Sequence, residues 1–220
     1  MKLIIGNKNY SSWSLRAWLL LAAGNVPFEE VKILLSQDET RTEIERYTNA
    51  GRVPVLHDKD LVVWDSLAIC EYVSEQYLSG KGWPADSQAR AKARSCCAEM
   101  HSGFFALRNQ MPMNCRAVNR RVPMTAELEK DIRRIDQIWT QMRNEYADLG
   151  PWLFGDFSIA DCMFAPVVFR FFTYDANVSE TSQQYMSTLL GHPDVQDWLG
   201  EARTEPEVID DDEAGHNGAS

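Results

Sequence analysis

The sequence contains few of the residues that bind metals or form disulfides. Its 220 residues include only four histidines and five cysteines. The histidines are scattered without the spacing of metal ligands, so we expect no metal site. The cysteine count is odd and no Cys-x-x-Cys pair occurs, which favours a reducing compartment such as the cytoplasm over a disulfide-stapled scaffold.

Long apolar runs and an excess of positive charge are absent as well. The stretch "WLLLAAG" at positions 18–24 is too short to span a membrane. The first residues lack the pattern of a signal peptide. The formal net charge is −10, whereas binding to nucleic acid requires a basic surface. We therefore expect a cytoplasmic protein with neither a membrane nor a nucleic-acid partner.

The first 78 residues alternate between strand and helix patterns. Strands are expected at "KLIIG", "FEEVKILL", "VPVLHD" and "LVVWD", where apolar residues cluster or alternate. Helices are expected at about 13–23, in "DETRTEIERYTN" and in "SLAICEYVSEQYL", whose apolar residues recur at helical spacing. The order β-α-β-α-β-β-α predicts an α/β domain over residues 1–78.

A linker and a helical region follow this domain. Residues 79–87, "SGKGWPADS", contain two glycines and a proline, which is typical of a linker. Apolar residues then repeat at helical spacing, so we expect an all-α domain over residues 88–204. Ser158 and Asp161 have the spacing of a capping box at the start of one of its helices. The acidic end, residues 205–220, is poor in apolar residues and is expected to be disordered.

Four short motifs resemble those of bacterial-type cytosolic glutathione transferases. They are "SSWSLRAWLLLAAG", which is similar to the serine-type N-terminal signature of the zeta class, "RVPVL", "DSLAICEYV" and "FSIADCMFAP". The resemblance implies a thioredoxin-like N-terminal domain followed by an all-α helical C-terminal domain. Two positions depart from the zeta signature, because Trp13 replaces a cysteine and Trp18 replaces an arginine. These departures count against the maleylacetoacetate isomerisation of that class.

Three serines, at positions 11, 12 and 14, open the first expected helix. From the residues alone, helix capping is a sufficient explanation, since serine is a preferred N-cap. The resemblance implies instead that the hydroxyl of Ser11, or failing that of Ser12, stabilises the thiolate of glutathione. Lowering a thiol pKa by about two units requires roughly 2.7 kcal/mol. A hydrogen bond to a charged acceptor supplies about 1.5–3 kcal/mol and a helix dipole about 0.3–1 kcal/mol.

The resemblance also implies which residues bind glutathione. Val53 would offer its backbone N–H and C=O to the cysteinyl part of the tripeptide, and Pro54 is expected to be cis. The residues alone favour an ordinary proline at a strand edge, and the resemblance reverses this expectation. Ser66 would bind the γ-glutamyl carboxylate and Asp65 the γ-glutamyl ammonium group, at a helix start that could also be a plain cap. Arg52 would reach a glutathione carboxylate or lie at a dimer interface.

The second substrate is expected to bind between the two domains. The candidate lining residues are His101, Phe104, Arg108 and Met111, although residues at such spacing usually belong to a core. The resemblance implies a cytoplasmic, homodimeric detoxification enzyme in which glutathione, the co-substrate, attacks a hydrophobic electrophile. Three alternatives stay open: glutathione-dependent isomerisation of a maleylacetoacetate-type diacid, a peroxidase or thiol–disulfide activity, and a non-catalytic binding or scaffold protein.

Overall fold

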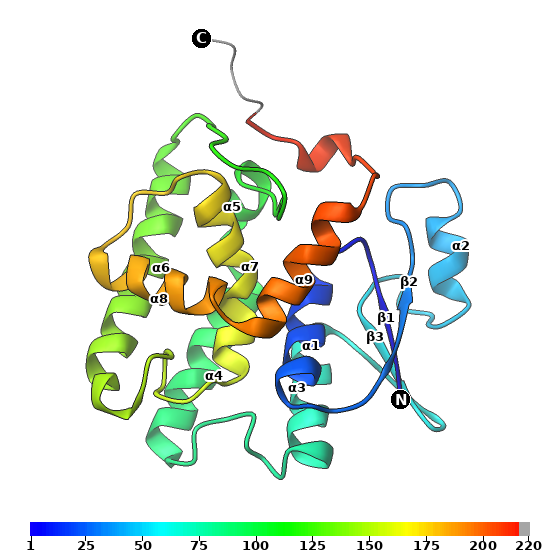
Figure 1. Cartoon of the computed structure of the whole chain (residues 1–220), viewed down its shortest axis with the longest axis horizontal. Coiled ribbons are helices and arrows are strands. Elements are labelled where there is room, and N and C mark those ends of the chain that lie inside the picture. Colours follow the sequence, from blue (N-terminus) through cyan, green and yellow to red (C-terminus); the bar gives the residue numbers. More distant parts are fainter. Residues whose placement is uncertain (216–220) are drawn as a thin grey trace.

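The computed structural model describes residues 1–215 and confirms the predicted order of elements in the N-terminal part (Figure 1). That part consists of β1 Lys2–Ile5, α1 Ser12–Ala23, β2 Glu29–Lys32, α2 Thr40–Glu45, β3 Val55–Asp58, β4 Leu61–Trp64 and α3 Ser66–Tyr77. The strands form one sheet in the order β2-β1-β3-β4, with β1 parallel to β2 and the other two pairs antiparallel. The short connection "HDKDL" allows the antiparallel pairing of β3 and β4.

Alternation along the strands divides the apolar residues between two faces of the sheet. Leu3 and Ile5 are fully buried in the main core, together with residues of α1 and α3. Ile4 and Val55 point to the opposite face, where Ile44 of α2 joins them in a smaller cluster. Because successive side chains of a strand point to opposite faces, α1 and α3 cover one face of the sheet and α2 covers the other (Figure 1).

The second part of the chain is helical, as predicted. Its elements are α4 Ser87–Ser102, α5 Phe105–Gln110, α6 Ala126–Glu145, the short 3-10 turn η1 Ala147–Leu149, α7 Ile159–Thr173, α8 Glu180–Leu190, α9 Pro193–Thr204 and the 3-10 turn η2 Asp210–Asp212. Helix α7 is buried on almost every side and packs against α1, α4 and α8, as expected for a helix that is apolar all round. Among the described residues, no helix has the length and apolar character needed to cross a membrane.

The predicted capping box at the start of α7 is present. The Ser158 hydroxyl accepts the N–H of Ala160, and the Ser158 N–H donates to Asp161 Oδ2 at 2.9 Å. Asp161 also accepts the Tyr185 hydroxyl at 3.2 Å, and burial raises its pKa to about 6. The main core is continuous from α1 and α3 into α4 and α7, so the domain limits at residues 78 and 88 stay predictions.

The prediction of a disordered end is wrong for residues 205–215. Glu205 and Ile209 are buried, and Glu213 accepts a hydrogen bond from the Tyr10 hydroxyl at 2.7 Å. The low apolar content of this segment predicted disorder, but the segment is held mainly by its carboxylates, which pair with N–H groups and cations. Residues 216–220 of the predicted disordered end lie outside the described residues.

Candidate functional site

Two adjoining cavities lie where the loops of the sheet face α1 and the helical part. The first, named the Ser66 cavity, has a volume of about 560 Å³, and its lining includes Arg52, Val53, Pro54, Asp65, Ser66 and His101. The second, named the Ser12 cavity, has a volume of about 440 Å³, and its lining includes Ser11, Ser12, Arg108, Arg170 and Asp212. Both are also lined by Trp13, Arg52 and Val53. A larger cavity of about 940 Å³ along residues 79–86 contains none of the predicted site residues.

The start of α3 forms one wall of the Ser66 cavity. Asp65 has a positive φ of 74° and caps α3 by accepting the N–H of Leu67 at 2.9 Å and that of Ala68 at 3.3 Å. The Ser66 side chain is 1% exposed, and its hydroxyl has no hydrogen-bond partner within residues 1–215. An unpaired buried hydroxyl is costly, so this wall presents an unused donor at the positive end of a helix.

The loop before β3 forms the opposite wall. The Val53–Pro54 peptide bond is cis, which confirms that prediction. Val53 precedes β3 and lies outside the paired residues of the sheet. The exposed Arg52 beside it adds a cation to the edge that the two cavities share.

The three serines have different surroundings. Ser11 is the residue before α1, but its side chain makes no capping bond. Its hydroxyl donates to Ser14 Oγ at 2.7 Å, and the same Oγ accepts the Gly6 N–H at 3.0 Å. Ser12 opens α1 and lines the cavity, and within the described residues no hydrogen bond engages its hydroxyl. Ser12 therefore presents a free donor to its cavity, and Ser11 is engaged with its neighbour.

Trp13 lines both cavities and lies against two arginines. The Arg16 guanidinium lies 4.3 Å and the Arg108 guanidinium 4.7 Å from the centre of a Trp13 ring, within the range of cation–π attraction. Arg16 is fully buried and donates from Nε to the carbonyl of Met163 at 3.1 Å. Burial, followed by the nearby Arg108 and Arg170, lowers the pKa of Arg16 to about 9. The guanidinium thus stays charged at neutral pH.

The Ser12 cavity lies in an unusually basic part of an acidic protein. Burial lowers the pKa of Arg170 to about 10, and that of Arg108 is also lowered by burial. Both still carry a positive charge at neutral pH. Asp212 brings a carboxylate to the same lining, and burial raises its pKa to about 6. The lining can therefore accommodate an anionic group.

All predicted site residues except two line one of the cavities. Phe104 and Met111 line neither cavity and are buried in the main core. This agrees with the alternative that residues at helical spacing belong to a core. His101 lies in the Ser66 cavity, with its Nε2 3.1 Å from Asp65 Oδ2. Sequence reasoning missed Arg170, a lone charge within the apolar run "VVFRFF" that could have indicated it. It also missed Asp212, for which no local pattern gave an indication.

The described residues offer no centre for metal or thiol chemistry. No group of three or more His, Cys, Asp or Glu side chains in residues 1–215 is placed to hold a metal ion. All five cysteines are buried and unpaired. Burial raises the pKa of Cys70 to about 12 and that of Cys96 to about 11, and only the thiolate form is reactive. These thiols therefore count against the thiol–disulfide alternative.

Two family models and many solved structures match the chain. Residues 10–76 match the model described as Glutathione S-transferase, N-terminal domain, and residues 125–201 match Glutathione S-transferase, C-terminal domain. A glutathione transferase homolog from Burkholderia, solved with bound glutathione, is 23% identical with a TM-score of 0.71, and the alignment covers 93% of this chain and 98% of that chain. A bacterial zeta-class maleyl pyruvate isomerase is 21% identical with a TM-score of 0.70, over 95% of this chain and 100% of that chain. These likenesses establish the predicted fold.

Curated relatives are similar over shorter stretches. A stringent starvation protein A homolog from Haemophilus ducreyi is 25% identical over 155 residues, which are 69% of this chain and 66% of the relative. A dichloromethane dehalogenase from Methylorubrum extorquens is 41% identical over 61 residues, 27% of this chain and 21% of the relative. A probable maleylacetoacetate isomerase from Caenorhabditis elegans is 32% identical over 99 residues, 45% of this chain and 46% of the relative. The chain thus spans less than two thirds of the length of these relatives.

Proposed function

Because the chain belongs to the glutathione S-transferase family, we propose that it is a glutathione transferase that acts on a small electrophile. The thiol of glutathione loses its proton, and the resulting thiolate attacks the electrophilic carbon. A carbon–sulfur bond forms while the leaving group departs with its electron pair. A thiol of ordinary pKa, about 8.5, is only a few per cent ionised at neutral pH, so the protein must favour the thiolate.

The observation that carries this proposal is the unpartnered, buried hydroxyl of Ser66. Its cavity adjoins the one lined by Ser12, whose hydroxyl has no hydrogen-bond partner among the described residues. Ser66, at the positive end of α3, would hold the γ-glutamyl carboxylate, and Asp65 would meet the ammonium group. The Val53 backbone would pair with the cysteinyl residue as an added strand does. Since Val53 lines both cavities, a peptide bound to it presents its thiol to the Ser12 cavity.

One of two serines would donate to the thiolate. Ser11 is the first candidate by its position in the signature, but its hydroxyl must leave Ser14 Oγ in order to reach the sulfur. Ser12 needs no such change. In either case the donor lies at the start of α1, where the helix dipole also favours a negative charge. Replacing each serine by alanine and measuring the pKa of bound glutathione separates the two, and an unchanged pKa in both variants would exclude the serine role.

A second candidate function is glutathione-dependent isomerisation of an unsaturated diacid. The arginines of the Ser12 cavity favour it, because Arg108 and Arg170 can meet a carboxylate there. In that reaction the thiolate adds to the double bond and is later expelled, so glutathione is regenerated. Kinetics with a chloronitrobenzene and with a maleyl diacid would separate transfer from isomerisation.

We further propose a homodimer that acts in detoxification in the cytoplasm. Strand β4 is an edge of the sheet, and it exposes Trp64 by 59% and Leu61 by 45%. Exposed apolar side chains on a sheet edge favour burial against a partner. Sedimentation of the purified chain tests the dimer, and a monomer at working concentration would contradict it.

The alternative from a different class is a non-catalytic binding protein. This alternative stays open because the Haemophilus relative is named for stringent starvation and not for a reaction. Calorimetry with glutathione is the first experiment, followed by a parallel screen with aryl halides, maleyl diacids, hydroperoxides and mixed disulfides. Binding with turnover of any of them supports the enzyme, whereas the lack of glutathione binding supports the non-catalytic protein.

A further inference from the structure

The loop between β1 and α1, residues 6–11, contains Ser11 and leads directly into Ser12, and it is here named the serine loop. Its own backbone bonds are few: the carbonyl of Asn7 accepts the N–H of Tyr10 at 3.2 Å and that of Ser11 at 2.8 Å. These bonds leave the N–H groups of Lys8 and Asn9 to be satisfied by other parts of the chain. Both residues are buried, and buried N–H groups require a partner.

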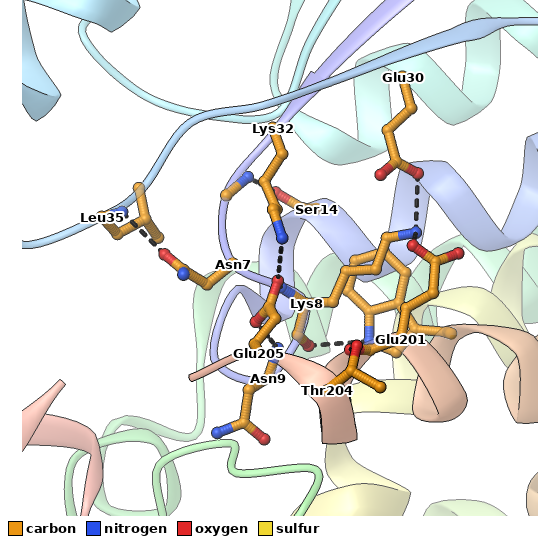
Figure 2. A network of polar contacts seen from close by, with 12 residues as sticks. Asn7, Lys8, Asn9, Ser14, Glu30, Lys32, Leu35, Glu201, Thr204 and Glu205 are labelled. Carbon is orange, nitrogen blue, oxygen red and sulfur yellow. Dashed lines mark hydrogen bonds and ion pairs between the residues drawn. The ribbon is translucent and has the colours of Figure 1, made fainter. Parts of the chain in front are cut away.

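Glu205 supplies both acceptors. Its Oε1 accepts the N–H of Lys8 at 2.8 Å and its Oε2 accepts the N–H of Asn9 at 3.0 Å. Figure 2 shows the carboxylate between this backbone and Lys32, whose Nζ lies 3.1 Å from Oε1. The Glu205 side chain is 3% exposed and follows α9 directly. A buried carboxylate with two N–H bonds and a cation is a strong and directional anchor.

Other contacts also hold the serine loop. The Trp198 Nε1–H of α9 donates to the carbonyl of Lys8 at 2.9 Å. The Lys8 ammonium forms ion pairs with Glu30 at 2.8 Å and with Glu201 at 2.7 Å (Figure 2). The Glu201 side chain is 60% exposed, and the buried Lys8 ammonium keeps Glu30 as a second partner.

The carbonyl groups of the serine loop have partners elsewhere in the chain, since the Asn9 carbonyl also accepts the Cys115 N–H at 3.1 Å. Among all these contacts, Glu205 is the side chain that satisfies the N–H groups of both Lys8 and Asn9.

We propose that Glu205 is a positioning residue for the thiol-activating serine, an inference that rests on the proposed transferase function. Glu205 lines neither cavity and cannot touch the substrates. Only Tyr10 separates Asn9 from Ser11, so a shift of the Lys8–Asn9 backbone is passed to the start of α1. A hydrogen-bond donor must stay within about 3 Å of its acceptor, and a misplacement of about 1 Å can reduce a rate by about a hundredfold.

The variant Glu205→Gln tests this role with little change of shape. It replaces one acceptor oxygen by an NH₂ group, which would face a backbone N–H, and it removes the charge that Lys32 meets. We expect the pKa of glutathione in the binary complex to rise and kcat/KM at neutral pH to fall about tenfold, as a small misplacement produces. Affinity for glutathione, which depends on the Ser66 cavity, should stay close to that of the wild type. Hydrogen exchange of residues 7–12 should become faster.

The matched control is Glu201→Gln, which removes the exposed partner of the Lys8 ammonium, keeps its ion pair with Glu30 and leaves the backbone bonds in place. It should keep the wild-type pKa and exchange rates. If Glu205→Gln lowers Tm but leaves the thiol pKa and kcat/KM unchanged, Glu205 is only structural and the proposal is wrong. If that variant does not fold, Glu205→Asp, whose side chain is one methylene shorter, is tested instead, and the same results support or refute the proposal.

The wild type separates this proposal from the one on which it rests. A wild type that binds no glutathione, or that leaves the thiol pKa unchanged on binding, refutes the transferase function and the positioning role together. If the wild type lowers the pKa of the bound thiol and the Glu205→Gln variant lowers it by the same amount, the positioning role alone is refuted.

Discussion

The Ser66 cavity and the Ser12 cavity differ in how their residues are brought together. The Ser66 cavity is lined mainly by residues 50–66, with Trp13 and His101 as additions from elsewhere. The Ser12 cavity takes residues from α1, α2, α5, α7 and the segment after α9. Local backbone geometry thus shapes the first cavity, whereas the packing of distant segments shapes the second. A binding site of the first kind can be recognised from short motifs, and one of the second kind cannot.

The largest expected effect tests the Ser66 cavity. Ser66→Ala should weaken glutathione binding by about ten- to a hundredfold, because a hydrogen bond to a charged acceptor is worth about 1.5–3 kcal/mol. The hydroxyl has no partner in the free protein, so the variant should unfold at the wild-type temperature or slightly above it. Calorimetry gives both values. Ser95→Ala, on the exposed face of α4, is the control, and equal affinities of Ser66→Ala and the wild type would contradict the assignment.

The next effect tests the charge of the Ser12 cavity. Arg108→Met should lower kcat/KM for chloronitrobenzoate about tenfold relative to the neutral chloronitrobenzamide, because one charged hydrogen bond is lost. Steady-state kinetics with the two substrates provides the ratio. Arg108 also donates to the carbonyl of Gly103 at 2.9 Å, but damage at that contact would slow both substrates alike. Arg134→Met, which removes an exposed ion pair with Glu99, should leave the ratio unchanged, and a similar ratio in both variants would argue against anion binding.

A smaller effect concerns the carboxylate of the same cavity. The pKa of Asp212 is raised from 3.8 to about 6 in the folded chain. Between these values the folded chain keeps a proton that the unfolded chain has lost, so stability from this group is complete below pH 3.8 and is lost as the pH rises through 6. Asp212→Asn should therefore show a smaller decrease of Tm over this range. Thermal unfolding at several pH values measures it, and parallel curves for the two proteins would contradict the burial of this carboxylate.

The smallest effect marks the border of the Ser12 cavity. Met111 is 1% exposed and lies in the core, so Met111→Leu should reduce the free energy of unfolding by less than about 1.5 kcal/mol. Substrate preference should not change, because this side chain does not line the cavity. Denaturant unfolding and the benzoate-to-benzamide ratio check the two statements. An altered benzoate-to-benzamide ratio would show that Met111 contacts the substrate, as expected from the sequence.

The fold and the first cavity could be predicted because each depends on local rules. The capping residues Asp65 and Ser158 mark helix starts, and the cis Pro54 lies in a recognisable motif. The stripe that contains Phe104 and Met111 was ambiguous, since the same spacing describes a core and a pocket. Only the packing of the two parts against each other decides between these.

The second cavity and its support could not be predicted, for a different reason. Arg170, Asp212 and Glu205 reach their partners across long stretches of chain, and their neighbours in sequence give no indication of this. Glu205 and Lys8 are 197 residues apart. Composition even favoured the opposite conclusion, since an acidic end that is poor in apolar residues is typical of disorder. The buried N–H groups that Glu205 satisfies belong to Lys8 and Asn9, far away in the sequence, so the composition of the end itself gives no sign of them.

The contact of Glu205 with the serine loop has a consequence for the order in which a newly made chain matures. Lys8 and Asn9 are synthesised near the beginning and Glu205 near the end of the described chain. A nascent chain that already contains the whole sheet still lacks the carboxylate for these two N–H groups. The serine loop can thus gain this anchor only after residue 205 has been made. A chain cut short before residue 205 would contain every candidate glutathione-binding residue without the anchor of its serine loop.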